Sequence, residues 1–315
     1  MSHRILIADK LDEVAVQVLA EAGFAVDRKP GLSEDALVET VPPYDAILVR
    51  SAVRITSRVI EAARNLKVVG RAGVGVDNID VPAATARGVL VMNVPGGNSI
   101  AAAEHAIALM FAMARMVPQA MTSLRGGAWE RSRFVGCELT QKTLGVVGFG
   151  AVGRIVADRA LGLRMQVVGY DPQVPAFVME GFGVRAARDL EALLRESDVV
   201  SLHLPLNSAT RNLFNRDAIR AMKRGAMLVN CARGGIVDEQ SLLEALNDGH
   251  LAGAAIDVWS KEPPPADHPL LHHPNVIATP HLGASTREAQ VRVAVAIANQ
   301  VRDFLLHGVK TGAVN

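Results

Sequence analysis

Cysteine is scarce in this chain, with only Cys137 and Cys231 among 315 residues. Two cysteines so far apart form no disulfide framework, no metal-ligand cluster and no C-x-x-C pair. We therefore expect no metal site and a reducing, cytoplasmic compartment. An excess of one charge is missing too, because the formal net charge is +1. Without a strong positive field, neither nucleic acid nor a membrane surface is expected as a partner.

Long apolar runs and internal repeats are also missing. The N-terminal residues MSHRILIADK predict a strand rather than a signal peptide. The Ala-rich stretch 100–117 is interrupted by Glu104, His105 and Arg115, so we expect a buried or interface helix rather than a membrane span. The length is sufficient for two domains, and no sequence period suggests a repeat architecture.

Residues 1–97 alternate short apolar segments with helical patterns. Because the apolar segments show no polar alternation, they predict a parallel sheet covered on both faces, a flavodoxin-like domain. The predicted strands are Arg4–Ala8, Phe24–Val26, Ala46–Val49, Val68–Gly70 and Leu90–Asn93. The predicted helices are Asp12–Ala22, Ser33–Val41, Ser57–Ala63 and Val81–Arg87.

The stretch TLGVVGFGAVGRIVADRALGLRMQVVGYD, residues 143–171, carries the strongest motif. Gly148, Gly150 and Gly153 follow an apolar strand in G-x-G-x-x-G spacing and open a helical pattern. This is the fingerprint of a dinucleotide-binding Rossmann unit, in which the helix N-terminus receives the pyrophosphate. Asp171 ends the next strand, where a carboxylate binds ribose hydroxyls and repels a 2′-phosphate, which favours NAD over NADP. An ordinary strand–turn–helix with incidental glycines is the alternative.

The remaining pattern predicts a second α/β domain. A long helix, Ile100–Met116, is expected, with Asn98 or Ser99 as its N-cap and with Pro118 soon after its end. The polar segment Arg125–Glu138 is expected to form an extended arm or loop. The further strands are Val199–Leu202, Met227–Asn230, Ala254–Asp257 and Val276–Ala278, with helices at Asp189–Arg195, Arg216–Ala221 and Glu239–Asn247. An amphipathic tail helix, Thr286–Leu306, is expected to return to the first domain. The predicted domains are therefore 1–97 plus 285–315, and 98–284.

Ionisable residues follow three of these strands, at the edge where open α/β sheets bind ligands. Arg233 could grip a carboxylate, His281 could exchange a proton, and Glu262 could fix the imidazole tautomer. With a nicotinamide nearby, this set fits hydride transfer from an alcohol beside a carboxylate. Other interpretations remain open. Arg233 could form a surface ion pair, Glu262 could be a solvated charge, His281 could be structural, and Asp257 could cap a helix. His105, His203 and His272 rank lower because no partner motif accompanies them.

Five segments together resemble the D-isomer-specific 2-hydroxyacid dehydrogenases. They are GRAGVGVD at 70–77, MNVPGGNS at 92–99, GAWER at 127–131, VNCARGGIVDE at 229–239 and PHLGASTRE at 280–288. The resemblance implies that Arg233, Glu262 and His281 are catalytic and that Asp257 holds the nicotinamide amide. The cofactor-binding residues it implies are Val74, Gly148, Gly150, Ala151, Val152, Gly153, Asp171, Cys231, Ala232, Arg233, Asp257, His281, Gly283 and Ala284.

The resemblance also implies a substrate, a partner and a regulatory difference. The substrate would be a phosphorylated 2-hydroxy acid, 3-phospho-D-glycerate, oxidised with NAD in the entry step to serine. Arg50, Arg71 and Asn98 would bind it, together with Arg131 from the second subunit of a homodimer or higher homo-oligomer. Many relatives continue into C-terminal regulatory domains, so a chain that stops at Asn315 is expected to be the catalytic unit alone. The alternatives are a hydroxypyruvate or glyoxylate reductase, another D-2-hydroxyacid dehydrogenase, and an NAD-sensing scaffold without catalysis.

Overall fold

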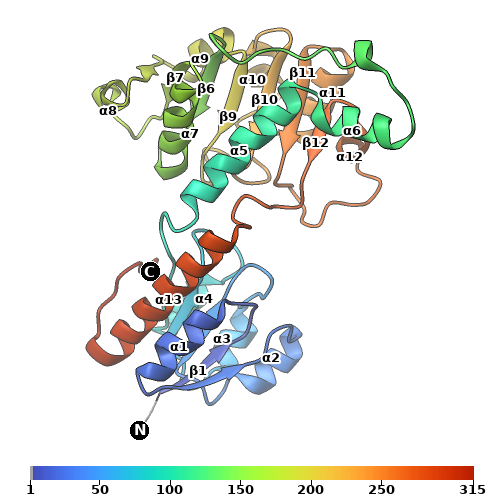
Figure 1. Cartoon of the computed structure of the whole chain (residues 1–315). Coiled ribbons are helices and arrows are strands. Elements are labelled where there is room, and N and C mark those ends of the chain that lie inside the picture. Colours follow the sequence, from blue (N-terminus) through green and yellow to red (C-terminus); the bar gives the residue numbers. More distant parts are fainter. Residues whose placement is uncertain (1–2) are drawn as a thin grey trace. The chain divides into compact units, whose positions relative to one another are not determined.

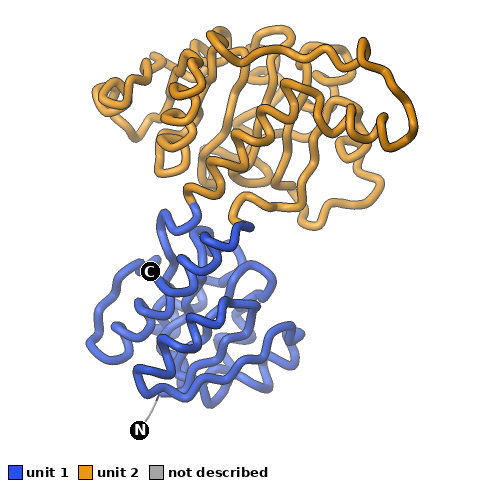
Figure 2. Tube along the Cα trace, in the orientation of Figure 1, with its two compact units in different colours: residues 1–98, 285–315 blue, residues 99–284 orange. Residues whose placement is uncertain are grey.

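A computed structural model describes residues 3–315, which divide into two compact α/β units (Figures 1 and 2). Unit 1 takes the chain up to Asn98 together with Ser285–Asn315, and unit 2 is Ser99–Ala284. The chain passes between the units twice. The first passage is at 98/99, one residue after the expected 97/98, and the second is at 284/285, where it is expected. The predicted class, two parallel-sheet α/β domains, is confirmed.

Unit 1 is built on a five-stranded parallel sheet with the order β2-β1-β3-β4-β5, which is the flavodoxin-like order. Successive residues of its strands face opposite layers. Ile5 and Ile7 of β1 contact the core under α1 and α13, whereas Leu6 contacts the core under α2, α3 and α4. The strands are β1 (Arg4–Ile7), β2 (Ala25–Arg28), β3 (Ala46–Val49), β4 (Val68–Arg71) and β5 (Leu90–Met92). The helices are α1 (Glu13–Glu21), α2 (Glu34–Thr40), α3 (Ser57–Ala62), α4 (Val81–Ala86) and α13 (Arg287–His307).

The C-terminal helix α13 packs on the sheet of unit 1 (Figure 1). Thr286 caps its first turn by accepting a hydrogen bond from the Ala289 amide, and Gly308 ends it in the left-handed region. A Cβ at Gly70 of β4 would lie 2.9 Å from side-chain atoms of Ile297 and Val301. The missing side chain therefore allows α13 to approach β4 closely.

Unit 2 contains a seven-stranded parallel sheet with the order β12-β11-β10-β9-β6-β7-β8. Counted within the unit this is 3-2-1-4-5-6-7, the Rossmann order with one strand added, and the strand order reverses between β6 and β9. The strands are β6 (Thr143–Val147), β7 (Gln166–Tyr170), β8 (Arg185–Ala186), β9 (Val199–Leu202), β10 (Ala226–Asn230), β11 (Leu251–Ile256) and β12 (Val276–Ala278). The helices are α5 (Ser99–Ala114), α6 (Val117–Arg125), η1 (Arg131–Arg133, 3-10), α7 (Ala151–Gly162), α8 (Ala176–Gly181), α9 (Leu190–Glu196), α10 (Arg216–Ala221), α11 (Glu239–Asn247) and α12 (Pro269–His272).

Some elements of unit 2 differ from the sequence prediction. The long helix α5 ends before Pro118, as expected, but Pro118 also lies in the first turn of a second helix, α6, which the sequence did not predict; a missing N–H costs nothing there. Met116, with φ 51°, separates α5 from α6. β11 begins at Leu251 and ends at Ile256, so Asp257 lies just outside it. The short elements β8, α8 and α12 were not predicted.

A transmembrane helix was not expected, and the described residues contain no single helix that is long and apolar enough to span a bilayer. Helices α5 and α6 pass that test only as a pair, across a bend of 61°.

Candidate active site

The loops after β10, β11 and β12 leave the same edge of the unit 2 sheet, because these strands are adjacent and parallel. Backbone hydrogen bonds join the loops: the His281 amide donates to the Asp257 carbonyl at 2.8 Å, and the Asp257 amide donates to the Asn230 carbonyl at 3.0 Å. A Cβ at Gly234 would lie 1.9 Å from the Trp259 carbonyl oxygen. The segments that carry Arg233, Glu262 and His281 are thus packed together, as the strand pattern predicts.

His281 and Glu262 form a hydrogen-bonded pair at this edge. Nδ1 of His281 lies 2.8 Å from Oε2 of Glu262, and the two side chains are 44% and 40% exposed. The other carboxylate oxygen accepts the Trp259 amide at 3.1 Å. Partial burial raises the pKa of Glu262, but the hydrogen bonds from His281 and Trp259 outweigh it, so the pKa lies below its usual value. The carboxylate is therefore ionised and engages Nδ1, so Nε2 is the ring nitrogen that the hydrogen bond to Glu262 does not use.

Asp257 is fully buried and binds the loop that carries His281. Its Oδ1 accepts hydrogen bonds from the Thr279 hydroxyl at 2.6 Å and the Leu282 amide at 2.7 Å, and its Oδ2 accepts the Gly283 amide at 2.9 Å. Burial raises the pKa of Asp257, and its hydrogen bonds lower it below the ordinary value. In this arrangement the carboxylate orders the loop; the nicotinamide contact implied by the resemblance stays a prediction.

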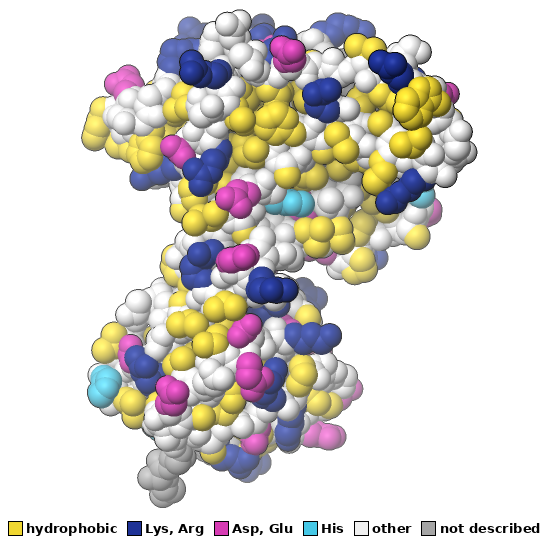
Figure 3. Space-filling view, in the orientation of Figure 1, with side chains coloured by type: hydrophobic (Ala, Val, Ile, Leu, Met, Phe, Trp, Pro, Cys, Tyr) yellow, Lys and Arg dark blue, Asp and Glu magenta, His cyan; other side chains and the backbone are white. Residues whose placement is uncertain are grey.

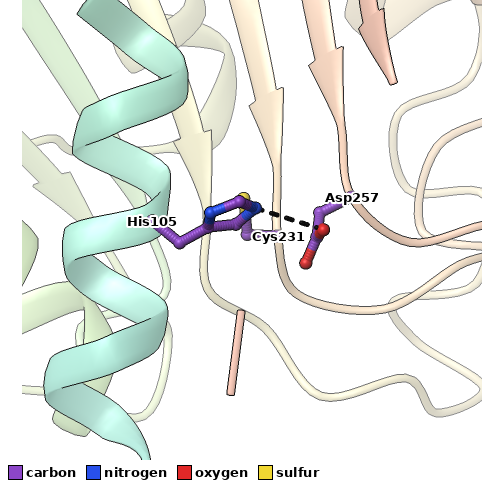
Figure 4. A group of neighbouring side chains, drawn as sticks. All are labelled: His105, Cys231 and Asp257. Carbon is purple, nitrogen blue, oxygen red and sulfur yellow. Dashed lines mark hydrogen bonds and ion pairs between the residues drawn. The ribbon is translucent and has the colours of Figure 1, made fainter. Parts of the chain in front are cut away.

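His105 has no partner motif in the sequence and is ranked below His281 as a candidate functional histidine, yet it lies against Asp257 (Figure 4). Its Nε2 is 3.2 Å from Oδ1 of Asp257 and 3.4 Å from the Thr279 hydroxyl. The two residues are 152 positions apart, so no local pattern could have paired them. His203 and His272 also have partners, the Ser201 hydroxyl and the Ala266 carbonyl.

His105, Cys231 and Asp257 have potential metal-ligand atoms within 4.8 Å of one another, the single group of this kind within residues 3–315. Their chemistry disfavours a metal. Burial and the charge of Asp257 raise the pKa of the Cys231 thiol, which keeps it protonated. The Asp257 oxygens already accept hydrogen bonds, so we assign no metal to this cluster.

The turn between β6 and α7 lies at the point where the strand order reverses. Gly148 has φ 93°, and a Cβ there would lie 2.5 Å from the His203 carbonyl oxygen. A Cβ at Gly153 would lie 2.0 Å from the Gly148 carbonyl oxygen. Both positions therefore require glycine, for the tight turn and for close packing of helix on strand.

The N-terminus of α7 fits a pyrophosphate. Gly150 caps the helix without a side-chain hydrogen bond, and a Cβ there would meet no heavy atom of the described residues within 4 Å. Ala151 and Val152 begin the helix, so their amides belong to its first turn. Asp171 follows β7, and its Oδ2 accepts the Phe149 amide at 2.8 Å. The open helix N-terminus offers N–H donors to a pyrophosphate, and the acid beside the turn offers an acceptor to ribose hydroxyls, which is the arrangement that dinucleotides use.

The other predicted cofactor residues of unit 2 lie at the same sheet edge. Cys231 and Ala232 follow β10, with the Ala232 amide donating to the Asn230 side chain at 3.1 Å. Gly283 and Ala284 follow His281. Arg233 is partly buried, and its Nη1 donates to the Ala232 carbonyl at 2.7 Å.

Four predicted residues belong to unit 1. Arg50 follows β3, Arg71 ends β4, and Val74 and Asn98 come after β4 and β5. Asp9, which the sequence analysis missed, is buried and accepts the Arg50 amide at 3.0 Å, so it fixes the backbone from which Arg50 extends. The fourth predicted substrate contact, Arg131, is exposed in η1 of unit 2.

A glycine-rich turn at the switch point of a parallel sheet, with a histidine–carboxylate pair at the same edge, defines a dinucleotide-binding α/β protein. Residues 107–283 match the family described as "D-isomer specific 2-hydroxyacid dehydrogenase, NAD binding domain". The chain belongs to the D-isomer specific 2-hydroxyacid dehydrogenase family.

Similar proteins support this assignment. The chain is 49% identical over 298 residues to D-3-phosphoglycerate dehydrogenase of Archaeoglobus fulgidus, covering 95% of this chain and 56% of the relative. It is 46% identical over 313 residues to the Homo sapiens enzyme of that name, covering 99% and 58%. The chain thus spans little more than half the length of these relatives.

Solved structures show the same fold over their whole length. NAD+-bound 3-phosphoglycerate dehydrogenase of Entamoeba histolytica has a TM-score of 0.85 at 30% identity, with 100% of this chain and 99% of that chain covered. A glyoxylate reductase from Paecilomyes thermophila has a TM-score of 0.88 at 29% identity, with 99% and 98% covered.

Proposed function

We propose that this chain catalyses NAD-dependent oxidation of 3-phospho-D-glycerate to 3-phosphohydroxypyruvate. The observation that carries the proposal is the 2.8 Å hydrogen bond between Nδ1 of His281 and Glu262 at the sheet edge that also carries Arg233. The names of the relatives that match almost the whole chain support this substrate.

His281 is the proposed acid and base. Its Nε2 takes the proton of the C2 hydroxyl, and Glu262 fixes the tautomer through Nδ1 and stabilises the imidazolium that forms. Arg233 binds the substrate carboxylate through its planar guanidinium and orients the C2 carbon. Bound NAD would supply the acceptor for the hydride that leaves C2. In the reverse direction His281 returns the proton.

The proposed NAD site is formed by the glycine-rich turn between β6 and α7 and by the N-terminus of α7. Backbone amides of Ala151 and Val152 bind the pyrophosphate, and Asp171 accepts hydrogen bonds from the ribose hydroxyls. Val74, Cys231, Ala232, Asp257, Gly283 and Ala284 complete the proposed set. A carboxylate at position 171 repels a 2′-phosphate, so we propose NAD as the preferred cofactor.

We propose that Arg50, Arg71, Asn98 and the partner subunit's Arg131 bind the substrate, with the arginines directed at its phosphate. A phosphate carries about two negative charges at neutral pH. Each charge-assisted hydrogen bond contributes on the order of 1.5–3 kcal/mol, so several would separate 3-phosphoglycerate from glycerate.

We also propose a homodimer in the cytoplasm. Helix α6, which lies wholly within the described residues, buries none of its side chains. Val117, Met121 and Leu124 are 52%, 45% and 57% exposed at spacings of four and three, which forms one apolar stripe. Figure 3 shows hydrophobic side chains gathered on the face of unit 2 that carries α5. An apolar stripe of this kind favours a second copy as its partner.

A substrate panel with NAD and NADP tests the proposed reaction. We expect kcat/KM for 3-phosphoglycerate with NAD to exceed that for D-glycerate by about a hundredfold or more, as two or more charged contacts would give. Comparable kcat/KM values for 3-phosphoglycerate and D-glycerate, or faster reduction of glyoxylate or hydroxypyruvate, would identify a different D-2-hydroxyacid dehydrogenase or reductase. NADH binding without turnover of any hydroxy acid would identify a scaffold instead.

A further inference from the structure

The loop that carries His281 has an unusual backbone conformation. His281 has φ 55°, in the left-handed region that residues with side chains adopt rarely and at a cost of about 1 kcal/mol or more. Such a conformation persists only where neighbouring contacts impose it. Here three hydrogen bonds to Asp257 do so, from the amides of His281, Leu282 and Gly283.

The side chain of Asp257 is therefore the fixed point of the loop. It is fully buried, and its carboxylate accepts hydrogen bonds from three residues of the loop, Thr279, Leu282 and Gly283. The donor from another element is His105, whose Nε2 reaches Oδ1 from helix α5 (Figure 4). Ala102, one turn earlier on α5, lies close to Gly283. His105 thus ties Asp257 to a helix that packs across β10, β11 and β12.

We propose that His105 is a positioning residue for His281. Its hydrogen bond holds the Asp257 carboxylate in the orientation that imposes the left-handed turn, and this turn aims the His281 imidazole. The proposal rests on the proposed function in that His281 is taken as the acid–base group. The groups that face Asp257 are His105, Thr279, the 282 and 283 amides, and the protonated thiol of Cys231.

Three variants of the full chain separate positioning from folding. His105→Phe removes the donor and keeps an aromatic ring, while His105→Gln can place an amide nitrogen where Nε2 was. His105→Asn keeps a polar side chain that is too short to reach Asp257, and it replaces the Phe variant if that protein does not fold. His250→Phe is the matched control, because His250 is a partly buried histidine of unit 2 bonded to the Ile219 carbonyl.

The first measurement is the NMR signal of the His281 imidazole in protein labelled with ¹³C-histidine, assigned with His281→Asn. We expect His105→Phe to shift this signal and its titration, His105→Gln to restore them, and His250→Phe to leave them unchanged. The second is steady-state kinetics, where His105→Phe should lower kcat about tenfold or more, the size expected for one hydrogen bond to a charged group.

An unchanged His281 signal in His105→Phe would overturn the proposal. A kcat of His105→Gln that is as low as that of His105→Phe would overturn it too. The NMR measurement does not depend on turnover. If the wild-type chain oxidises no hydroxy acid, the proposed function fails, while the His281 signal still decides whether His105 positions the loop.

Discussion

The pair formed by His281 and Glu262 concentrates the proposed chemistry in two side chains. His281→Asn removes the titratable ring and keeps a polar group, so we expect kcat to fall by about two to four orders of magnitude. NADH should still bind, because the pyrophosphate and ribose contacts are made elsewhere. Stopped-flow or steady-state turnover together with NADH fluorescence titration measures both.

Glu262→Gln provides the companion measurement. The amide can still hydrogen-bond to Nδ1 but no longer stabilises an imidazolium, so its loss of kcat should be smaller than that of His281→Asn. Near-normal turnover by His281→Asn would rule out the assigned role.

Asp171 has one observed contact and one proposed role, and a single substitution tests both. Its Oδ2 holds the Phe149 amide in the glycine-rich turn, and its charge is proposed to select the ribose. Asp171→Ala should weaken NADH binding and narrow the preference for NADH over NADPH. Binding titrations with both cofactors check this, and an unchanged preference would show that another group reads the ribose.

His203 links the stability of unit 2 to pH. Burial lowers the pKa of His203 from 6.5 to about 4. Between these values the unfolded chain takes up a proton that the folded chain does not, so the contribution to stability is complete above pH 6.5 and is lost as pH falls toward 4. The loss is at most on the order of 3 kcal/mol. In urea unfolding from pH 7 to 4, wild type should lose stability more steeply than His203→Gln; parallel curves would contradict this.

At the residue scale, sequence reasoning finds side chains that follow strands and misses those whose partners are distant. Arg233, Glu262 and His281 lie in the loops that follow β10, β11 and β12 of one sheet, so a strand pattern suffices to bring these loops together. His105 and Asp9 acquire their roles only through Asp257 and Arg50, which the fold brings close from 152 and 41 residues away. No local spacing encodes such contacts.

At the level of elements, the β6–α7 turn depends on close backbone packing. Gly153→Ala would place a Cβ 2.0 Å from the Gly148 carbonyl oxygen, so we expect a loss of about 1–3 kcal/mol in stability and weaker NADH binding. Thermal unfolding and NADH titration measure the two effects.

Gly162→Ala is the matched control on the same helix. A Cβ there would meet no described atom within 4 Å, and alanine favours a helix by up to about 1 kcal/mol. This variant should be neutral or more stable. Equal behaviour of the two variants would show that the turn tolerates a side chain.

The sequence predicts elements well where burial dictates the pattern. Strands such as Ala46–Val49, buried on both faces, were located correctly from their apolar runs. Helix α6 is not predicted because its apolar residues are exposed, and because Pro118, which does follow the end of α5, also lies in the first turn of α6. The two-residue β8 is too short to produce a pattern of its own.

At the scale of the whole molecule, the exposed stripe of α6 lies in the same segment as Arg131, the proposed substrate contact. Both lie in residues 117–131, where Trp129 is also 77% exposed. If a second copy covers this segment, the same interface that buries the stripe brings Arg131 to the partner. Dimerisation and recognition of the substrate phosphate should therefore be lost together.

The double variant Met121→Lys/Leu124→Lys tests this coupling. It places two charges on the stripe and leaves the core unchanged, so in analytical ultracentrifugation we expect the variant to sediment as a monomer and wild type to sediment as a dimer. KM for 3-phosphoglycerate should rise at least about tenfold, as expected for the loss of a charged contact, while NADH affinity is retained. Leu306→Lys, at a 48% exposed leucine of α13, is the control and should remain dimeric. A double variant that still sediments as a dimer would show that α6 is not the interface, and a monomer with unchanged KM would show that Arg131 does not reach the partner's substrate.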